Sequence, residues 1–243
     1  MKDNLKVAAV IQARMGSARL PGKMMMDLCG YSVLHWVLCR VKRAHRLTEV
    51  ILATSSLKRD DPLAELAGSL GVKVFRGSEA DVLGRYRDAA RKFDAPVVMR
   101  VCADNPFIAP EELDRLVDCY RSRLQSGGDP GRLYVFNHLT TMDNNYPDGL
   151  GAEIISRELL ETFDRLAKTP SEREHVITYL WDHPREFEIY PVFAPPEIAY
   201  PGVKLDVDTQ EDLERLRQLG ARLSFESSAL QVVLAYLDLF GEY

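Results

Sequence analysis

Short apolar runs alternate with amphipathic segments through the first 125 residues, and this alternation constrains the fold more than any other feature. The apolar runs have the length of strands, and the segments between them carry apolar residues at helical spacing. We expect strands at residues 6–11, 50–54, 72–75 and 96–101 and helices at residues 32–43, 61–70, 81–93 and 110–124. This pattern predicts an α/β fold with a Rossmann-like, mostly parallel sheet covered by helices on both faces.

The rest of the chain is less regular and follows a glycine-rich loop at 126–131. We expect strands at residues 133–137, 152–155, 187–192 and 203–207 and helices at residues 157–166, 172–183, 210–219 and 229–240. The last of these helices is apolar on nearly every side, which predicts that it packs on the core or on a second subunit. We therefore expect one domain over residues 1–243, with a smaller elaboration after the glycine-rich loop.

The segment that follows the first expected strand concentrates positive charge and glycine on one loop. Its glycines and its charged or hydroxyl side chains are Arg14, Gly16, Ser17, Arg19, Gly22 and Lys23. Glycine lets the backbone approach a ligand closely, and arginine pairs with phosphate oxygens through two hydrogen bonds. Five residues separate the two glycines and Met24 follows the lysine, which does not match a Walker A motif. We interpret the segment as a triphosphate-binding loop; the alternative is a solvated basic turn.

Carboxylates are expected at the same edge of the sheet, beyond the carboxyl ends of the strands. Asp104 follows the strand expected at 96–101, and Asp206 and Asp208 alternate at the end of the strand expected at 203–207. Side chains two residues apart on a strand share a face, and such close carboxylates repel unless a cation intervenes. Because Mg²⁺ takes one or two carboxylates together with phosphate oxygens, we predict a magnesium site here. The alternatives are a turn cap for Asp104 and a helix cap for Asp208.

A third polar group lies at residues 145–149 and 170–175. Residues 171–174 have the spacing of a capping box and predict the start of a helix. That start leaves Arg173 and His175 unexplained, and an arginine near a helix N-terminus can bind a substrate carboxylate or phosphate. Arg173 and His175 are compatible either with acceptor binding or with a solvated helix face.

Composition excludes several classes of partner. A formal net charge of −5 argues against nucleic-acid binding, and no apolar run approaches the ~18 residues needed to span a bilayer. No signal-peptide layout is present at the N-terminus. The four cysteines show neither C-x-x-C nor zinc-ligand spacing, which indicates reduced thiols. We expect a cytoplasmic protein that binds neither nucleic acid nor membrane.

Seven short motifs resemble, in order, those of the cytidylyltransferases that activate acidic sugars, especially the spore-coat-polysaccharide and acylneuraminate cytidylyltransferase-like proteins. They are ARMGSARLPGK at 13–23, ATS at 53–55, FRGSEADVLGRY at 75–86, ADNP at 103–106, YPDGL at 146–150, PSEREHV at 170–176 and VDTQEDL at 207–213. The resemblance implies a nucleotide-diphospho-sugar transferase fold and Mg²⁺-dependent transfer of CMP from CTP to an acidic sugar, with release of pyrophosphate. A preference for cytosine and a homodimer are likewise implied.

The resemblance also implies roles for individual residues, matched by position. The triphosphate would be bound by Arg14, Gly16, Ser17, Arg19 and Lys23. The nucleoside would lie along Ala13, Thr54, Arg76 and Ser78. The metal would be held by Asp104, Asp206 and Asp208, and the residues expected to carry catalysis are Arg14, Lys23, Asp104 and Asp206. Acceptor contacts are expected from Asn137, Tyr146, Asp148, Gly149, Glu153, Arg173 and His175. Residues 1–125 would then form a nucleotide-binding half and residues 132–243 an acceptor- and metal-binding half.

Two departures from the pattern concern the acceptor rather than the nucleotide. Gly151 stands where spore-coat-like relatives often carry an aspartate, and Asn105 replaces a more usual small or acidic residue. The identity of the acceptor, which could be an ulosonic acid, another acidic sugar, a phosphonate or a phosphate, therefore stays open.

Two other functions are compatible with parts of the pattern. A nucleotide-sugar-dependent glycosyltransferase shares the fold, but a diphosphate donor does not need three cations in one loop. A nucleotide-binding regulator without catalysis would not need the basic loop and the carboxylates together. Pyrophosphate release from CTP in the presence of an acceptor distinguishes the proposed enzyme from both.

Overall fold

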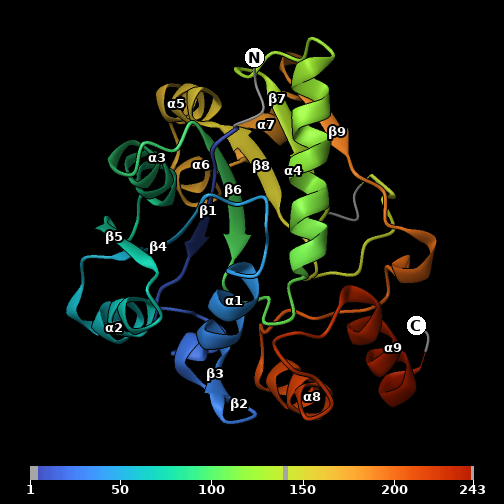
Figure 1. Cartoon of the computed structure of the whole chain (residues 1–243). Helices are drawn as coiled ribbons and strands as arrows, with labels where there is room; N and C mark the ends of the chain where they lie inside the picture. Colours follow the sequence, from blue (N-terminus) through green and yellow to red (C-terminus); the bar gives the residue numbers. More distant parts are fainter. Residues whose placement is uncertain (1–4, 139–141, 242–243) are drawn as a thin grey trace.

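In the computed structural model, which describes residues 5–138 and 142–241, a seven-stranded sheet lies between two layers of helices (Figure 1). The strand order is β5-β4-β1-β6-β8-β7-β9. Their bounds are β1 Val7–Gln12, β4 Glu49–Ser55, β5 Lys73–Gly77, β6 Val97–Cys102, β7 Leu133–Phe136, β8 Glu153–Ser156 and β9 Glu188–Pro191. Only β8 runs against its neighbours; the other strand pairs are parallel. The expected mostly parallel sheet is confirmed.

Alternation along β1 shows why this strand is apolar from Val7 to Ile11. Val7, Ala9 and Ile11 point into the larger core, whereas Ala8 and Val10 point into a second core on the other face. All five side chains are at most 1% exposed. A strand covered on both faces needs apolar residues at every covered position, and β1 meets that condition up to its last residue, Gln12, which lines the cleft described below.

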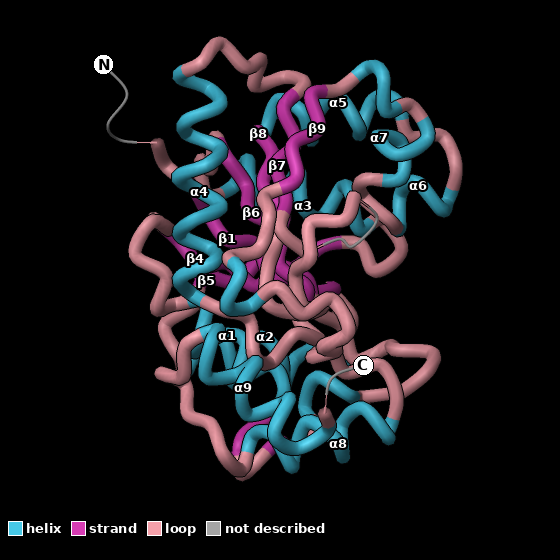
Figure 2. The backbone as a smooth tube through the Cα atoms, turned by 90° about the vertical axis from the view of Figure 1, so that its right-hand side faces the viewer, coloured by secondary structure: helices cyan, strands magenta, loops and turns pink. Residues whose placement is uncertain are grey.

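Helices from both halves of the chain complete the two cores. The larger core receives α1 Val33–Val41, α2 Asp61–Ser69, α4 Pro110–Gln125, α8 Gln210–Gly220 and α9 Ala229–Phe240. The second face is covered by α3 Val82–Lys92, α5 Arg157–Leu166 and α7 Thr178–Asp182. The short helix α6 Pro170–Glu174 has no buried residue and packs beside α3 and α7. Figure 2 shows α8 and α9 at one end of the molecule and α5 and α7 at the other. None of the helices described is long and apolar enough to cross a membrane.

Short elements complete the described part of the chain. They are the hairpin strands β2 Asp27–Leu28 and β3 Tyr31–Ser32 and the 3₁₀ turns η1 Lys23–Met25, η2 Lys58–Asp60, η3 Pro184–Glu186 and η4 Pro196–Ile198. All four cysteines are free thiols, as expected.

The prediction of one helix over residues 172–183 with a capping box at 171–174 is wrong in the length of the helix and in the capping residues. The capping box is formed by Thr169 and Glu172, because Pro170 occupies the first turn, where a missing N–H costs nothing. The helix α6 ends at Glu174, and the backbone of His175 leaves the helical region before α7 begins. Two short helices therefore replace one long one and bend the chain at the mouth of a cleft described below.

The strand expected at 203–207 does not form. In the described residues this segment makes one isolated bridge, between Lys204 and Asp148, and a hydrogen bond from the Val207 N–H to the Asp104 carbonyl oxygen at 2.9 Å. The alternation inferred from the sequence is nevertheless present, because Leu205 and Val207 are fully buried while the aspartates between and after them are partly exposed. The segment thus carries two carboxylates across the end of the sheet.

The fully buried side chain of Arg40, on α1, fastens the C-terminal helices to the sheet layer. Its guanidinium donates to the carbonyl oxygens of Ile108 at 2.7 Å and Ser227 at 2.9 Å, and to those of Ser224 and Phe225 at 3.2 Å each. Burial lowers the pKa of Arg40 to about 10, so the group stays charged at neutral pH. Three carbonyls of the turn at 224–227 and that of Ile108, before α4, therefore depend on one side chain.

Replacing this guanidinium should destabilise the fold. We expect Arg40→Met to lower the free energy of unfolding by about 3 kcal/mol, because buried carbonyl oxygens lose their donors. Urea unfolding measures the change. The exposed neighbour Arg43→Met, whose charge lies 3.5 Å from Glu226, is the control and should change stability by less than about 0.5 kcal/mol. Equal losses in both variants would contradict the role assigned to Arg40.

Candidate active site

A cleft of about 490 Å³ opens beyond the carboxyl ends of β1 and β6. The residues singled out from the sequence that line it are Ala13, Arg14, Ser17, Arg19, Lys23, Asp104, Glu153 and His175. They come from both halves of the chain. The cleft lies where parallel sheets usually bind their ligands.

The basic loop is held in shape by a buried carboxylate. Asp60 is fully buried and accepts a hydrogen bond from the Met15 N–H at 2.8 Å, while its other oxygen accepts from the N–H and hydroxyl of Ser55 at the end of β4. Gly22 has φ of +74°, a conformation that favours glycine, and its N–H donates to the Met15 carbonyl oxygen at 3.0 Å. The loop is therefore anchored to the neighbouring strand before any ligand binds.

Lys23 joins the basic loop to the carboxylates. Its ammonium donates to the Val207 carbonyl oxygen at 2.6 Å, to Asp104 Oδ2 at 3.0 Å and to Asp208 Oδ1 at 3.1 Å. The side chain is 9% exposed, and all three donors of the ammonium are used. Arg19 reaches the other oxygen of Asp208 at 2.8 Å. Cations from the start of the chain and anions from its middle and end are thus bonded in one group. Arg19, Lys23 and Asp104 of this group line the cleft, whereas Asp206 and Asp208 lie outside its lining.

Two further carboxylates lie beside this group. Burial and the charge of Asp148 raise the pKa of Asp206 to about 6, and the Lys204 ammonium, 3.7 Å away, offsets only part of that. The pKa of Asp148 is also raised, by burial and by the charges of Asp104 and Asp208. One oxygen of Asp206 is buried with no hydrogen-bond partner among the described residues. The carboxylates are short of positive charge.

Arg14 lies at the mouth of the cleft and pairs with a residue of α6. Its guanidinium bonds to Glu174 Oε1 at 2.5 Å, and both side chains are about one third exposed. His175 follows Glu174 at the end of α6 and lines the same cleft. The bend between α6 and α7 places both residues there.

A charged cluster, of which the sequence reasoning predicted Glu153 but missed Arg100 and His138, forms the floor of the cleft. Glu153, at the start of β8, contacts Arg100 of the paired strand β6, accepts a hydrogen bond from the Tyr134 hydroxyl and lies 3.1 Å from His138 Nε2. Burial and the charge of Arg100 lower the pKa of His138 to about 3, so this imidazole is neutral. The only sequence signal was an arginine inside an apolar strand, Val97–Cys102.

Several residues matched to the nucleoside or the acceptor lie outside the lining of the cleft. Arg76 bonds to the carbonyl oxygens of Ser55 and Leu57 and to Asp61, and the exposed Ser78 accepts from the Asp81 N–H. Arg173 is held by Asp81 and Asp164, each at 2.8 Å, so its charge fastens α6 to the helices beside it. Thr54 is fully buried. These side chains shape the walls behind the cleft.

Asn137 and Tyr146 are fully buried and already have partners. The Asn137 amide bonds to the Glu112 carbonyl oxygen and to the Ala152 N–H, and the Tyr146 hydroxyl donates to Glu112 and accepts from Arg115. Neither side chain is therefore free to contact an acceptor directly in this structure. Their place in the fold is to hold α4 against the segment that leads into β8.

Two glycines are required by their surroundings. A Cβ on Gly151 would lie 2.2 Å from Asn137 Oδ1 and 2.4 Å from the Asn137 carbonyl oxygen, which excludes an aspartate in this backbone. Gly149 has φ of +96°, and a Cβ there would lie 3.0 Å from Leu205. A Cβ on Gly16 would meet only the ends of two flexible side chains, Glu79 at 3.0 Å and Arg59 at 3.1 Å.

Comparisons with known proteins agree with this geometry. A family model described as cytidylyltransferase matches residues 8–234. The spore coat polysaccharide biosynthesis protein SpsF of Bacillus subtilis is 32% identical over 93% of this chain and 92% of its own length.

Solved structures are similar as well. A cytidylyltransferase from Leptospira borgpetersenii is 32% identical, with a TM-score of 0.86 over 97% of this chain and 95% of that one. CMP:2-keto-3-deoxy-manno-octonic acid synthetase complexed with CTP is 21% identical, with a TM-score of 0.63 over 89% of this chain and 98% of that one, and it supports the fold. The chain belongs to the cytidylyltransferase family and is a CTP-dependent nucleotidyltransferase.

Proposed function

We propose that the cleft transfers CMP from CTP to an acidic sugar or a related anionic acceptor in the synthesis of surface polysaccharide precursors, with release of pyrophosphate. The observation that carries the proposal is the Lys23 ammonium, which bonds to Asp104 and Asp208 at once and so brings the basic loop to the carboxylates. The relative named for spore coat polysaccharide biosynthesis and the solved synthetase complexed with CTP support the same chemistry.

The positively charged residues of the cleft would bind and orient the nucleotide. Arg14, Arg19 and Lys23 bind the triphosphate and align its α-phosphorus with the acceptor oxygen. That oxygen forms a bond to the α-phosphorus and passes its proton to solvent, and the bond from the phosphorus to the β-phosphate oxygen breaks, so that pyrophosphate leaves. The negative charge that collects on the departing pyrophosphate lies against the same three cations.

The carboxylates fit a divalent cation. Asp104 and Asp206 would hold Mg²⁺ with Asp208 beside them, since one Asp206 oxygen is buried without a partner and the pKa of this group is raised. In the part of the chain that the structure describes, no group of three His, Cys, Asp or Glu side chains is placed to hold a metal by itself. Mg²⁺ would therefore need further ligands from phosphates and waters. When bound, Mg²⁺ neutralises phosphate oxygens beside the reacting phosphorus.

The acceptor is proposed to lie over the floor of the cleft. Arg100 can pair with an anionic group of the acceptor, Glu153 and the neutral His138 can hydrogen-bond its hydroxyls, and His175 lies at the mouth. The nucleotide would then be bound mainly by residues 1–125 and the acceptor mainly by residues 132–243. A homodimer remains a prediction; Leu230 and Leu234 of α9 are exposed apolar residues that a second subunit could cover.

The direct test combines nucleotide binding with turnover. We expect Mg²⁺–CTP to raise the melting temperature more than UTP, GTP or ATP does, because a ligand of the native state stabilises it. Pyrophosphate release with a panel of ulosonic acids, other acidic sugars, phosphonates and phosphates should identify the acceptor. Lys23→Ala and Asp104→Ala should each lower turnover by about 10²–10³-fold and remain folded by circular dichroism.

Lys58→Ala is the matched control, because Lys58 is exposed and lies outside the lining of the cleft. Near-normal pyrophosphate release from Lys23→Ala or Asp104→Ala would contradict the proposal.

The ion pair between Arg14 and Glu174 competes with the nucleotide. Glu174→Gln should therefore bind CTP about two- to fivefold more tightly, because a partly exposed pair contributes ~0.5–1 kcal/mol that the triphosphate must otherwise displace. Isothermal titration calorimetry measures the dissociation constant. Glu186→Gln makes the same change of net charge at an exposed site outside the lining of the cleft and should leave affinity unchanged. Weaker binding by Glu174→Gln would show that Glu174 supports the triphosphate site.

Asp206 should make the ligand-free protein less stable as pH rises. A carboxyl whose pKa is raised on folding favours the folded state at low pH, and that contribution is lost as pH rises through about 6. Asp206→Asn should therefore increase the free energy of unfolding at pH 7.5 by up to about 3 kcal/mol and by about half as much at pH 5. The exposed Asp182→Asn is the control for charge.

Urea unfolding at the two pH values measures both variants. The same Asp206→Asn variant should lose the stabilisation that Mg²⁺ adds to bound CTP. A gain in stability that does not depend on pH would contradict the assigned pKa shift.

A further inference from the structure

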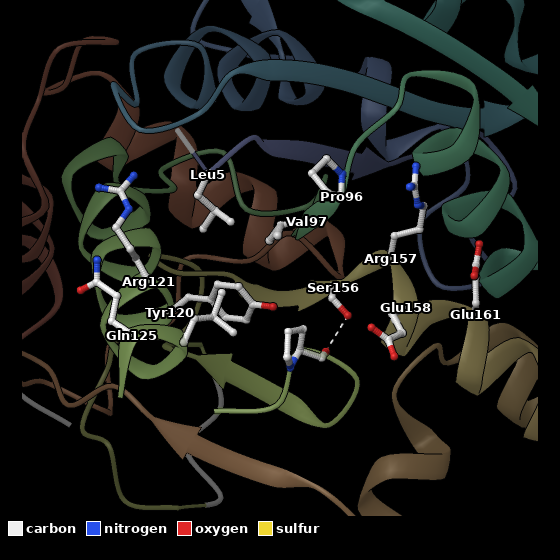
Figure 3. Close-up of a pocket in the computed structure, with 12 residues that line it drawn as sticks. Leu5, Pro96, Val97, Tyr120, Arg121, Gln125, Ser156, Arg157, Glu158 and Glu161 are labelled. Carbon is white, nitrogen blue, oxygen red and sulfur yellow. Dashed lines mark hydrogen bonds between the residues drawn. The ribbon is translucent and has the colours of Figure 1, made fainter. Parts of the chain in front are cut away.

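A second cavity of about 480 Å³ lies at the opposite ends of the two strands that form the floor of the cleft. Val97, at the amino end of β6, pairs with Ser156, at the carboxyl end of β8, and both line the second cavity. Arg100 and Glu153, at the other ends of the same two strands, line the cleft. Figure 3 shows the second cavity between Tyr120 of α4 on one side and Arg157 and Glu158 of α5 on the other.

A buried hydroxyl faces this cavity without a partner. Tyr120 is fully buried, its ring lines the cavity and its hydroxyl points toward the middle in Figure 3. Among residues 5–138 and 142–241 this hydroxyl has no hydrogen-bond partner. Ser156 also lines the cavity, but its hydroxyl already donates to the Pro130 carbonyl oxygen at 2.6 Å and accepts from the Leu159 N–H at 2.9 Å. Buried polar groups in proteins are almost always satisfied, so this one calls for an occupant of the cavity.

The walls and the rim restrict what the occupant can be. Leu5, Pro96, Val97 and Leu124 make the walls apolar. At the rim two arginines and two glutamates balance in charge. Three of these four are already paired: Arg121 with Asp118 at 3.6 Å, Arg157 with Asp94 at 3.2 Å and Glu161 with Arg91 at 2.9 Å. An anion gains nothing from a rim whose charges cancel. An uncharged molecule with one oxygen acceptor matches the buried hydroxyl.

We propose that this cavity is a second ligand site, which binds a small uncharged molecule with an apolar ring or short branched chain and one carbonyl, ether or hydroxyl oxygen. The oxygen accepts a hydrogen bond from the Tyr120 hydroxyl, and the apolar part packs on Val97 and Leu124. The site is separate from the cleft in position and in chemistry, since the cleft is built for highly charged ligands.

The first test needs no ligand. Tyr120→Phe removes a hydroxyl that has no partner, so the melting temperature of the free protein should stay equal or rise. Tyr146→Phe is the matched control, because Tyr146 is equally buried but its hydroxyl bonds to Glu112 and Arg115. The control should melt several degrees lower. A loss in Tyr120→Phe as large as in the control would show that the hydroxyl has a partner within the protein, and would overturn the proposal.

The second test uses acetophenone, an uncharged ring ketone, as the probe and benzoate as its anionic counterpart. Acetophenone should shift the methyl resonances of Val97 and Leu124 saturably and leave those of Val82, which lines the cleft, unmoved. Tyr120→Phe should weaken this binding by about five- to tenfold, the effect of one hydrogen bond. Leu124→Trp, which fills the cavity, should abolish it.

Three results would overturn the proposal. They are the absence of a saturable shift with acetophenone, tighter binding of benzoate than of acetophenone, and binding that Tyr120→Phe leaves unchanged. All of these readouts are independent of CTP turnover, so failure of the nucleotidyl-transfer assignment would leave this test intact.

Discussion

The position of one buried ammonium, that of Lys23, determines how the two parts of the chain meet. A lysine that is 8% exposed stays charged at low cost only when anions and carbonyl oxygens surround it, and Asp104, Val207 and Asp208 supply them. These partners lie 81 to 185 residues away in the sequence. The sheet brings the ends of β1 and β6 together, and the segment at 203–209 crosses that edge to complete the group.

The free site is neutralised by its own residues, and this explains how it can bind a highly charged ligand. Each cation of the basic loop has a carboxylate partner: Arg14 has Glu174, Arg19 has Asp208, and Lys23 has both Asp104 and Asp208. On the proposed function, the phosphates of the nucleotide would replace the carboxylates on the cations, and the carboxylates so released would be free to hold Mg²⁺. Ligand binding would then be an exchange of partners, and the partly exposed pairs Arg14–Glu174 and Arg19–Asp208 would open first.

Local sequence patterns predicted most of the helices and strands and the basic loop. The order of the sheet and the partners of the site residues depend on contacts between residues far apart in the sequence. Each predicted strand except that at 203–207 has a counterpart, because apolar runs report burial directly. The order of the sheet and the reversed β8 depend on pairings that a single sequence does not display. The same limit applies to the site: Arg173 and Tyr146 look available in the sequence, but Asp81 and Glu112, 92 and 34 residues away, already bind them. Glu153 was predicted, yet its partner Arg100 was not.

The two cavities lie at opposite ends of the strand pair β6–β8. One has many charged residues in its lining and the other has apolar walls, and buried residues of the two strands lie between them. Val98, Met99, Ile154 and Ile155, between the two ends, are fully buried. These packed apolar side chains separate the two cavities, so a ligand in one does not contact the polar groups of the other. What the two ends share is the register of one antiparallel pair, from Val97–Ser156 to Arg100–Glu153. A change in side-chain packing at either end that shifted this register would also move the Arg100–Glu153 pair, because neighbouring positions in a paired strand cannot slip independently.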